Sequence, residues 1–170
     1  MASERTARGD WKGGWLCHVA VGDFTITVDE PESVVGGTNQ GPQPTDLLLA
    51  SVASCFALAL AHAARKRSVP LHHLSVDVTG VYDGPRFESI RVDAEVGCEE
   101  HELDRLLTMA ERVCYVTNTL RGGPELIIDG TVVPGLAAVD EQSVHRLVSD
   151  MDVSDLTQMH ESPRREADQE

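Results

Sequence analysis

Basic and aromatic residues are both scarce in this sequence. The chain has 170 residues, with 14 Lys and Arg against 28 Asp and Glu, which gives a formal net charge of −14. So acidic a surface is not attracted to nucleic acid or to anionic membranes, which excludes both as partners. Aromatic side chains make up 4% of the chain, so its core must be mainly aliphatic.

The cysteines lack the spacings that mark metal or disulfide frameworks. The four are Cys17, Cys55, Cys98 and Cys114, and no Cys-x-x-Cys pair occurs among them. The cysteines and histidines together do not show zinc spacing, so no metal is predicted. The first ten residues lack the basic-then-apolar pattern of a secretory signal. We therefore expect a cytoplasmic protein, in whose reducing compartment a disulfide is transient or catalytic.

One long apolar stretch organises the rest of the chain. Residues 47–64 are almost entirely apolar, and helix formers dominate them. Pro44 suits the first turn of a helix, and the basic residues 65–67 suit its end. A membrane span is the alternative, because about 18 apolar residues are the lower limit for crossing a bilayer. The stretch is rich in alanine and contains Ser51, Ser54 and His62, which favours a buried central helix in a soluble protein.

Strand patterns flank this helix on both sides. Apolar and polar residues alternate in four segments, residues 15–21, 24–28, 74–79 and 90–96, which predicts two hairpins with turns at 22–23 and 83–85. Residues 99–120 have helical spacing, a further strand is predicted at 125–128 or, at its longest, as far as 133, and 140–151 are weakly amphipathic. The element order predicts an α+β fold.

Three regions are predicted along the chain. Residues 1–13 are a flexible N-terminus, 14–133 form one domain, and 134–170 form an extension with a weak helix and then an acidic tail. One thin sheet cannot cover a helix that is apolar on every side. Burial of the remaining face against a second copy predicts a homodimer.

Two cysteine-containing segments resemble one family. Glycines precede Pro44-Thr-Asp-Leu, and Ala53-Ser-Cys-Phe follows in the same helix; Cys114 lies four residues after Ala110 and two before Val116. This pattern, over roughly residues 14–128, resembles the OsmC/Ohr family of osmotically inducible protein C and organic hydroperoxide resistance protein. The resemblance implies an intertwined homodimer, with antiparallel sheets wrapped around two long central helices.

The resemblance also implies a chemistry. Peroxidase members carry a reactive and a resolving cysteine, roles that it implies for Cys55 and Cys114. A thiolate attacks the O–O bond of an organic hydroperoxide, an alcohol leaves, and the sulfenic acid condenses with a second thiol. An external dithiol then reduces the disulfide, and no cofactor is needed. The implied function is oxidative-stress defence by a thiol-dependent peroxidase.

The sequence departs from the peroxidase pattern around Cys55. Thr45 stands ten positions before Cys55, where those members have a glutamate, and Asp46 is one step further on. The strand at 15–21 has no arginine, and His18 is the candidate there for positive charge. Tyr115 follows Cys114 where proline is frequent. Thr45, Asp46 and His18 are therefore the possible activating or pocket residues.

Two alternatives remain open. A cysteine inside an apolar helix is more often a packed residue than a reactive one. From composition alone Cys55 is structural, and only the resemblance makes it reactive. The second functional class is a non-catalytic OsmC-like protein that binds a hydrophobic or acyl ligand in the pocket at its dimer interface. The missing Glu/Arg pair favours binding, and the two cysteines favour the peroxidase.

Overall fold

The computed structural model describes residues 4–133. Eight elements follow one another: β1 (Arg8–Gly13), β2 (Leu16–Val21), β3 (Phe24–Val28), α1 (Pro44–Arg67), β4 (His73–Tyr82), β5 (Phe87–Gly97), α2 (Glu100–Val113) and α3 (Tyr115–Gly122). The predicted elements at 140–151 and the acidic tail lie outside the described residues. Contacts divide the chain into two compact units, Met1–Gly80 with Ile90–Gly123, and Val81–Ser89 with the chain from Pro124. Both candidate cysteines lie in the first unit.

The first sheet is antiparallel, in the order β1-β2-β3. The predicted strands at 15–21 and 24–28 are confirmed as β2 and β3, which pair from Val21 with Phe24 to Cys17 with Val28. Gly22 occupies the turn between them at a φ of 58°, a conformation that glycine adopts without strain. Residues 8–13 were expected to be part of a flexible N-terminus. This is wrong, because they form β1 and pair with β2.

A tightly held loop leads from β3 into α1. The carboxylate of Asp29, which is almost fully buried, accepts hydrogen bonds from the amides of Glu30 (2.8 Å), Thr38 (3.1 Å) and Gln40 (3.2 Å) and from the Thr38 hydroxyl. These bonds tie both ends of the loop to one charged group. A Cβ atom on Gly41 would collide with the carbonyl oxygen of Thr27, so this close approach requires glycine.

The long apolar stretch is confirmed as α1. At its start the amide of Gln43 donates to Asp46 Oδ2 (3.1 Å), and at its end Ser68 adopts a left-handed conformation. By length and composition α1 is the one described helix that could cross a membrane. The core helix of a soluble protein passes the same test, and α1 contributes six buried residues: Val52, Phe56, Ala59, Leu60, Ala63 and Ala64.

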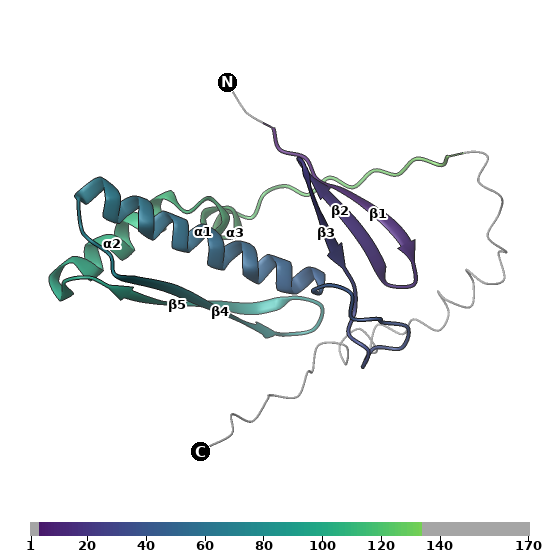
Figure 1. Cartoon of the computed structure of the whole chain (residues 1–170). Helices are drawn as coiled ribbons and strands as arrows, with labels where there is room; N and C mark the ends of the chain where they lie inside the picture. Colours follow the sequence, from purple (N-terminus) through teal and green to yellow (C-terminus); the bar gives the residue numbers. More distant parts are fainter. Residues whose placement is uncertain (1–3, 134–170) are drawn as a thin grey trace, which may run out of the picture. The chain divides into compact units, whose positions relative to one another are not determined.

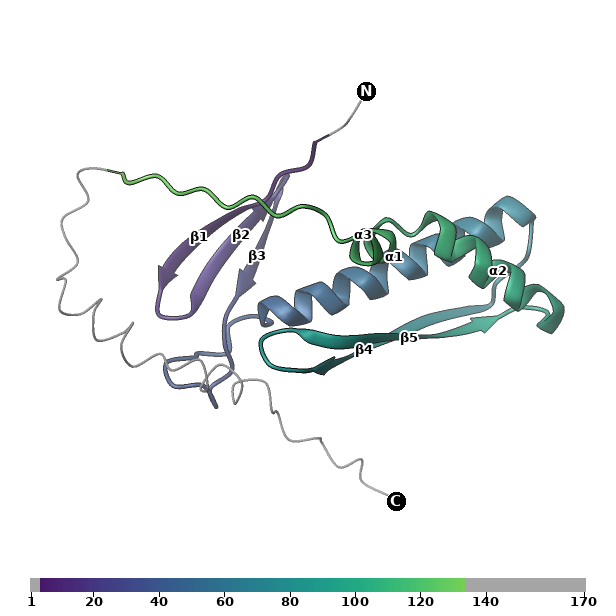
Figure 2. The same ribbon diagram turned by 180° about the vertical axis from the view of Figure 1, so that it is seen from behind.

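The core lies between this helix, α2 and the β4–β5 hairpin. Leu60 of α1 and Leu106 of α2 are both completely buried in it. Alternate strand residues pack against the same cluster, namely Leu74 and Val76 of β4 and Val92, Ala94 and Val96 of β5. Figures 1 and 2 show α1 and α2 on the same face of the hairpin. The core is aliphatic, as the composition predicts.

Two predicted elements differ from the structure. The single helix predicted over 99–120 is divided into α2 and α3, with the break at Cys114. No strand forms at 125–128 or up to 133, and Leu126, Ile127 and Ile128 are strongly exposed. A strand requires hydrogen bonds to a neighbouring strand, and these residues have no such neighbour within residues 4–133.

Candidate functional site: two cysteines between α1 and α3

Cys55 lies in the middle of α1 and is half-buried. The next residue, Phe56, is buried, and so is Ala59 one turn later. The Cys55 side chain packs against the core cluster that these residues form with Leu106, Ala110 and Cys114. A residue here is held rigidly, because the helix fixes its backbone and the core fixes its surroundings.

Cys114 occupies the break between α2 and α3 and is completely buried. Its amide donates to the carbonyl of Ala110 (2.9 Å), which closes the last turn of α2, and its ψ of 105° then turns the chain out of the helix. Its own carbonyl accepts the Asn118 amide (3.1 Å) of the first turn of α3. Cys114 is therefore the N-cap of α3, not a residue within one long helix as predicted.

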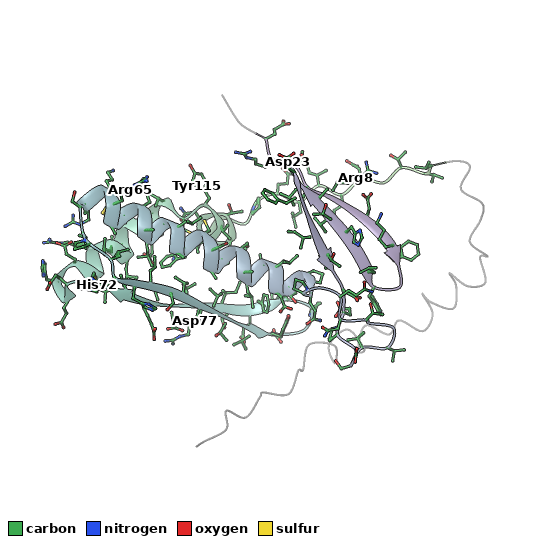
Figure 3. All side chains as sticks on the ribbon, in the orientation of Figure 1. Arg8, Asp23, Arg65, His72, Asp77 and Tyr115 are labelled. Atoms are coloured by element: carbon green, nitrogen blue, oxygen red, sulfur yellow. The ribbon has the colours of Figure 1, made fainter. Side chains whose placement is uncertain are left out.

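The residues that follow Cys114 stabilise this break. The side-chain amide of Asn118 donates to the carbonyl of Arg112 (3.2 Å), which has lost its helical partner. The Thr117 hydroxyl donates to the carbonyl of Cys114 (3.3 Å). Tyr115 points into solvent, as Figure 3 shows, and is 84% exposed. The consecutive Thr117 and Asn118, whose side chains commonly bond to nearby backbone, were the signal for this break.

The structure places both cysteines in one core. Cys55 of α1 packs against the cluster that contains Cys114, and the Cys55 thiol is among the groups that lower the pKa of Cys114. Burial alone raises the pKa of Cys114. The Thr117 hydroxyl, the amides of Thr117 and Val116, and the Cys55 thiol outweigh that burial and hold the pKa below its ordinary value. The Cys114 side chain makes no regular cap hydrogen bond to the first amides of α3.

The three other candidate residues are placed apart from this pair. Asp46 lies nine positions before Cys55 on the same helix, about 14 Å along its axis, and its carboxylate caps the helix start. Thr45 lies beside it, and its buried hydroxyl oxygen has no hydrogen-bond partner among the described residues. His18 lies in β2, in register with Asp10 of β1 and Thr27 of β3. No hydrogen bond or ion pair of the described residues joins any of the three to Cys55 or Cys114.

The remaining cysteines occupy structural positions. Cys17 is half-buried in β2, between Trp11 of β1 and Val28 of β3. Cys98 follows β5 and packs against the core cluster. Within residues 4–133 no group of three or more His, Cys, Asp or Glu side chains is arranged to hold a metal ion. The site therefore consists of Cys55 and Cys114, with Thr117 and the N-terminus of α3.

Solved structures define the class of protein to which this arrangement belongs. An OsmC-like protein from Mycoplasma pneumoniae aligns with a TM-score of 0.61 at 20% identity, over 72% of this chain and 91% of that one. An organic hydroperoxide resistance protein OsmC from Legionella pneumophila aligns with a TM-score of 0.53 at 22% identity, over 72% and 92%. The chain has the OsmC fold, which combines helices and sheets.

Sequence comparison identifies the family. The family described as OsmC-like protein matches residues 37–129, more than half of this chain. An uncharacterized protein of Haloferax volcanii is 31% identical over 124 residues, which cover 71% of this chain and 88% of that protein. This chain belongs to the OsmC-like protein family.

Proposed function

We propose that this protein is a cysteine-based peroxidase that reduces organic hydroperoxides in defence against oxidative stress. The packing of Cys55 against the core cluster that contains Cys114 supports the proposal. Two thiols in contact on rigid elements can form a disulfide after one of them is oxidised, and the disulfide protects the protein from over-oxidation. Relatives of the same fold include a protein named for organic hydroperoxide resistance.

Burial assigns the two roles. Cys55 is the half-buried thiol and Cys114 the completely buried one, so a peroxide reaches Cys55 first. Cys55 attacks the peroxide and becomes a sulfenic acid, and Cys114 displaces its hydroxyl group to form the disulfide. A dithiol from outside the protein then reduces the disulfide. The apolar residues around the pair suit an alkyl or acyl hydroperoxide better than hydrogen peroxide.

The working protein is proposed to be a cytoplasmic homodimer. Leu48 and Leu58 of α1 remain exposed in the single chain although the helix is apolar throughout. A second copy that covers this face would complete the burial of α1, as it does in the family fold that the sequence resembles. No metal or organic cofactor is required by the proposed chemistry.

Consumption of an organic hydroperoxide by the pure protein with a dithiol reductant tests this function. The wild type is expected to consume the peroxide, and Cys55→Ser is expected to abolish consumption. Cys17→Ser is the matched control, because Cys17 is also half-buried but lies in β2, and it should retain activity. Equal rates for wild type and Cys55→Ser contradict the proposal.

A non-catalytic binding function is the second candidate. It is favoured by the position of Asp46, the acidic residue of α1 next to the family's glutamate position, which caps the helix start about 14 Å from Cys55. In that case the apolar surface around the cysteines holds a hydrophobic or acyl ligand. A protein that leaves hydroperoxide unchanged but binds a fluorescent fatty acid would support this candidate instead.

A further inference from the structure

A surface depression lies between the end of α1 and α2, and neither candidate cysteine lines it. Its volume is about 380 Å³, and its lining consists of Arg67 from α1 and of Asp104, Arg105, Thr108 and Met109 from α2. Sites that hold small molecules have volumes of about 300–1,000 Å³, so this depression is large enough for one. The side chains that line it indicate which kind of molecule fits.

The two arginines of the depression are held by one carboxylate. Nε and Nη2 of Arg67 donate to Glu102 Oε2 at 3.0 and 2.8 Å, and Nη1 of Arg105 lies 3.7 Å from Glu102 Oε1. The side chain of Glu102 is 15% exposed and that of Arg67 is 31% exposed, so the guanidinium of Arg67 is fixed in place. Glu102 balances one of the two positive charges and leaves the other without a balancing partner in this bridge.

Both guanidinium groups keep donors that a ligand can use. No hydrogen bond among the described residues involves Nη1 of Arg67, or Nε and Nη2 of Arg105. The donors of a guanidinium lie in one plane and match the paired oxygens of a carboxylate or phosphate group. Arginine also gives up its hydration more readily than lysine, which favours direct contact with such a group. The donors in the depression therefore suit an oxyanion.

The other lining residues suit hydroxyl groups and a short carbon skeleton. The Thr108 hydroxyl donates to the backbone carbonyl of Asp104 (2.8 Å), so its own oxygen remains able to accept a hydrogen bond. The Asp104 carboxylate has no ion pair or hydrogen bond within residues 4–133 and accepts as well. Met109 packs against the core cluster and supplies an apolar wall. Hydroxyl donors beside an oxyanion would complement this lining.

We propose that this depression binds a small hydroxylated organic anion. Its carboxylate or phosphate group is held by Arg67 and Arg105, and its hydroxyl groups donate to Thr108 and Asp104. The site is additional to the proposed peroxidase function, because no step of that chemistry uses these residues. The chain as a whole has a net charge of −14 and repels anions at long range, so binding depends on direct contact with the two arginines.

Three related compounds test the site in titrations of the full-length protein. Glycerate carries a carboxylate, glycerol phosphate carries a phosphate, and glycerol has hydroxyl groups without a charge. At least one of the two anions should bind with a dissociation constant of about 1 mM or lower, and glycerol should not. The anion that binds more tightly identifies the preferred oxyanion. Failure of both anions to bind, or equally tight binding of glycerol, overturns the proposal.

Replacement of Arg105 tests which residues hold the anion. Arg105→Gln removes a guanidinium whose side chain is 64% exposed, so the core is left intact. Binding should weaken at least about tenfold, because a hydrogen bond between two charged groups is lost. Arg112→Gln is the matched control: it changes the net charge equally, but Arg112 is exposed, lies about 10 Å further along α2 and does not line the depression.

The variants separate a binding site from two other roles of these arginines. Wild-type affinity in Arg105→Gln overturns the site and leaves the arginines as a link between α1 and α2. Equal losses in Arg105→Gln and Arg112→Gln also overturn it, because they show an effect of overall charge. Cys55→Ser should bind the anion as the wild type does, so the result does not depend on whether the protein reduces peroxides.

Discussion

Replacement of Leu58 by alanine tests whether a second copy covers the outer face of α1. Leu58 lies on the α1 face away from the core and is 72% exposed in the single chain. Complete burial of a leucine side chain is worth about 1.5–3 kcal/mol, so burial of this exposed part contributes about 1–2 kcal/mol per protomer. A symmetric interface contains the residue twice, which gives about 2–4 kcal/mol. Leu58→Ala should therefore weaken dimerisation by about 30-fold to 700-fold.

Sedimentation equilibrium over a dilution series measures this effect. The wild type should be a dimer at micromolar concentration, and Leu58→Ala should dissociate within the accessible range. Val35→Ala is the control for an exposed apolar residue outside α1, since Val35 is 95% exposed in the preceding loop, and it should leave the dimer unchanged. A well-folded monomeric wild type, or an unchanged dissociation constant for Leu58→Ala, would refute the reasoning.

Two further predictions concern stability. Leu106→Ala removes a completely buried side chain between α2 and α1 and should lower the free energy of unfolding by about 2–5 kcal/mol in guanidinium titrations at fixed protein concentration; a change within about 0.5 kcal/mol would contradict the assigned core. The Thr38 hydroxyl, with the amides of Gln40, Glu30 and Thr38, holds the pKa of Asp29 below its ordinary 3.8 despite burial. This stabilisation is complete above pH 3.8 and is lost as the pH falls through the folded-state pKa, so Asp29→Asn should be less stable than wild type at neutral pH and the difference should shrink on acidification; a constant difference would contradict the role of the charge.

The elements that the sequence predicts correctly are those with strong local patterns. Residues 47–64 are apolar on every side, which predicts a helix, and α1 includes all of them. The alternation at 90–96 places Val92, Ala94 and Val96 on the core side of β5. These elements could be predicted because the spacing of their apolar side chains along the sequence decides which residues are buried.

The sequence does not correctly predict the strands whose formation depends on a neighbouring strand. Residues 8–13 are polar and show no alternation, and they become β1 because β2 offers them hydrogen bonds. Residues 125–128 have the composition of a strand but no neighbouring strand in the part of the chain that the structure describes. Local pattern cannot specify either case, because a strand is defined by its pairing.

The break at Cys114 was missed because helical spacing continues across it. Ala110 and Cys114 are four positions apart and are buried together, as they would be in an unbroken helix. The structure differs from an unbroken helix in the backbone at Cys114, which is the N-cap of α3. The first amides of α3 therefore have no acceptor in a preceding helical turn. The two cysteines could be singled out from the sequence by resemblance, but their placement in one core depends on this break and on the packing of α3 against α1.

The composition limits how a thiolate could be stabilised in this protein. The chain has twice as many acidic as basic residues, and several of the described arginines are paired with carboxylates: Arg67 with Glu102 (2.8 Å), Arg91 with Asp93 (2.7 Å) and Arg8 with Asp10 (3.0 Å). A cation buried beside Cys55 would itself have to be desolvated, which costs several kcal/mol unless it is paired. Backbone amides at a helix start carry no net charge and are fixed in direction by the fold, so they stabilise an anion without that cost. Negative charge on Cys114, at the start of α3, would therefore be stabilised by the amides of Val116 and Thr117, which are among the groups that lower its pKa.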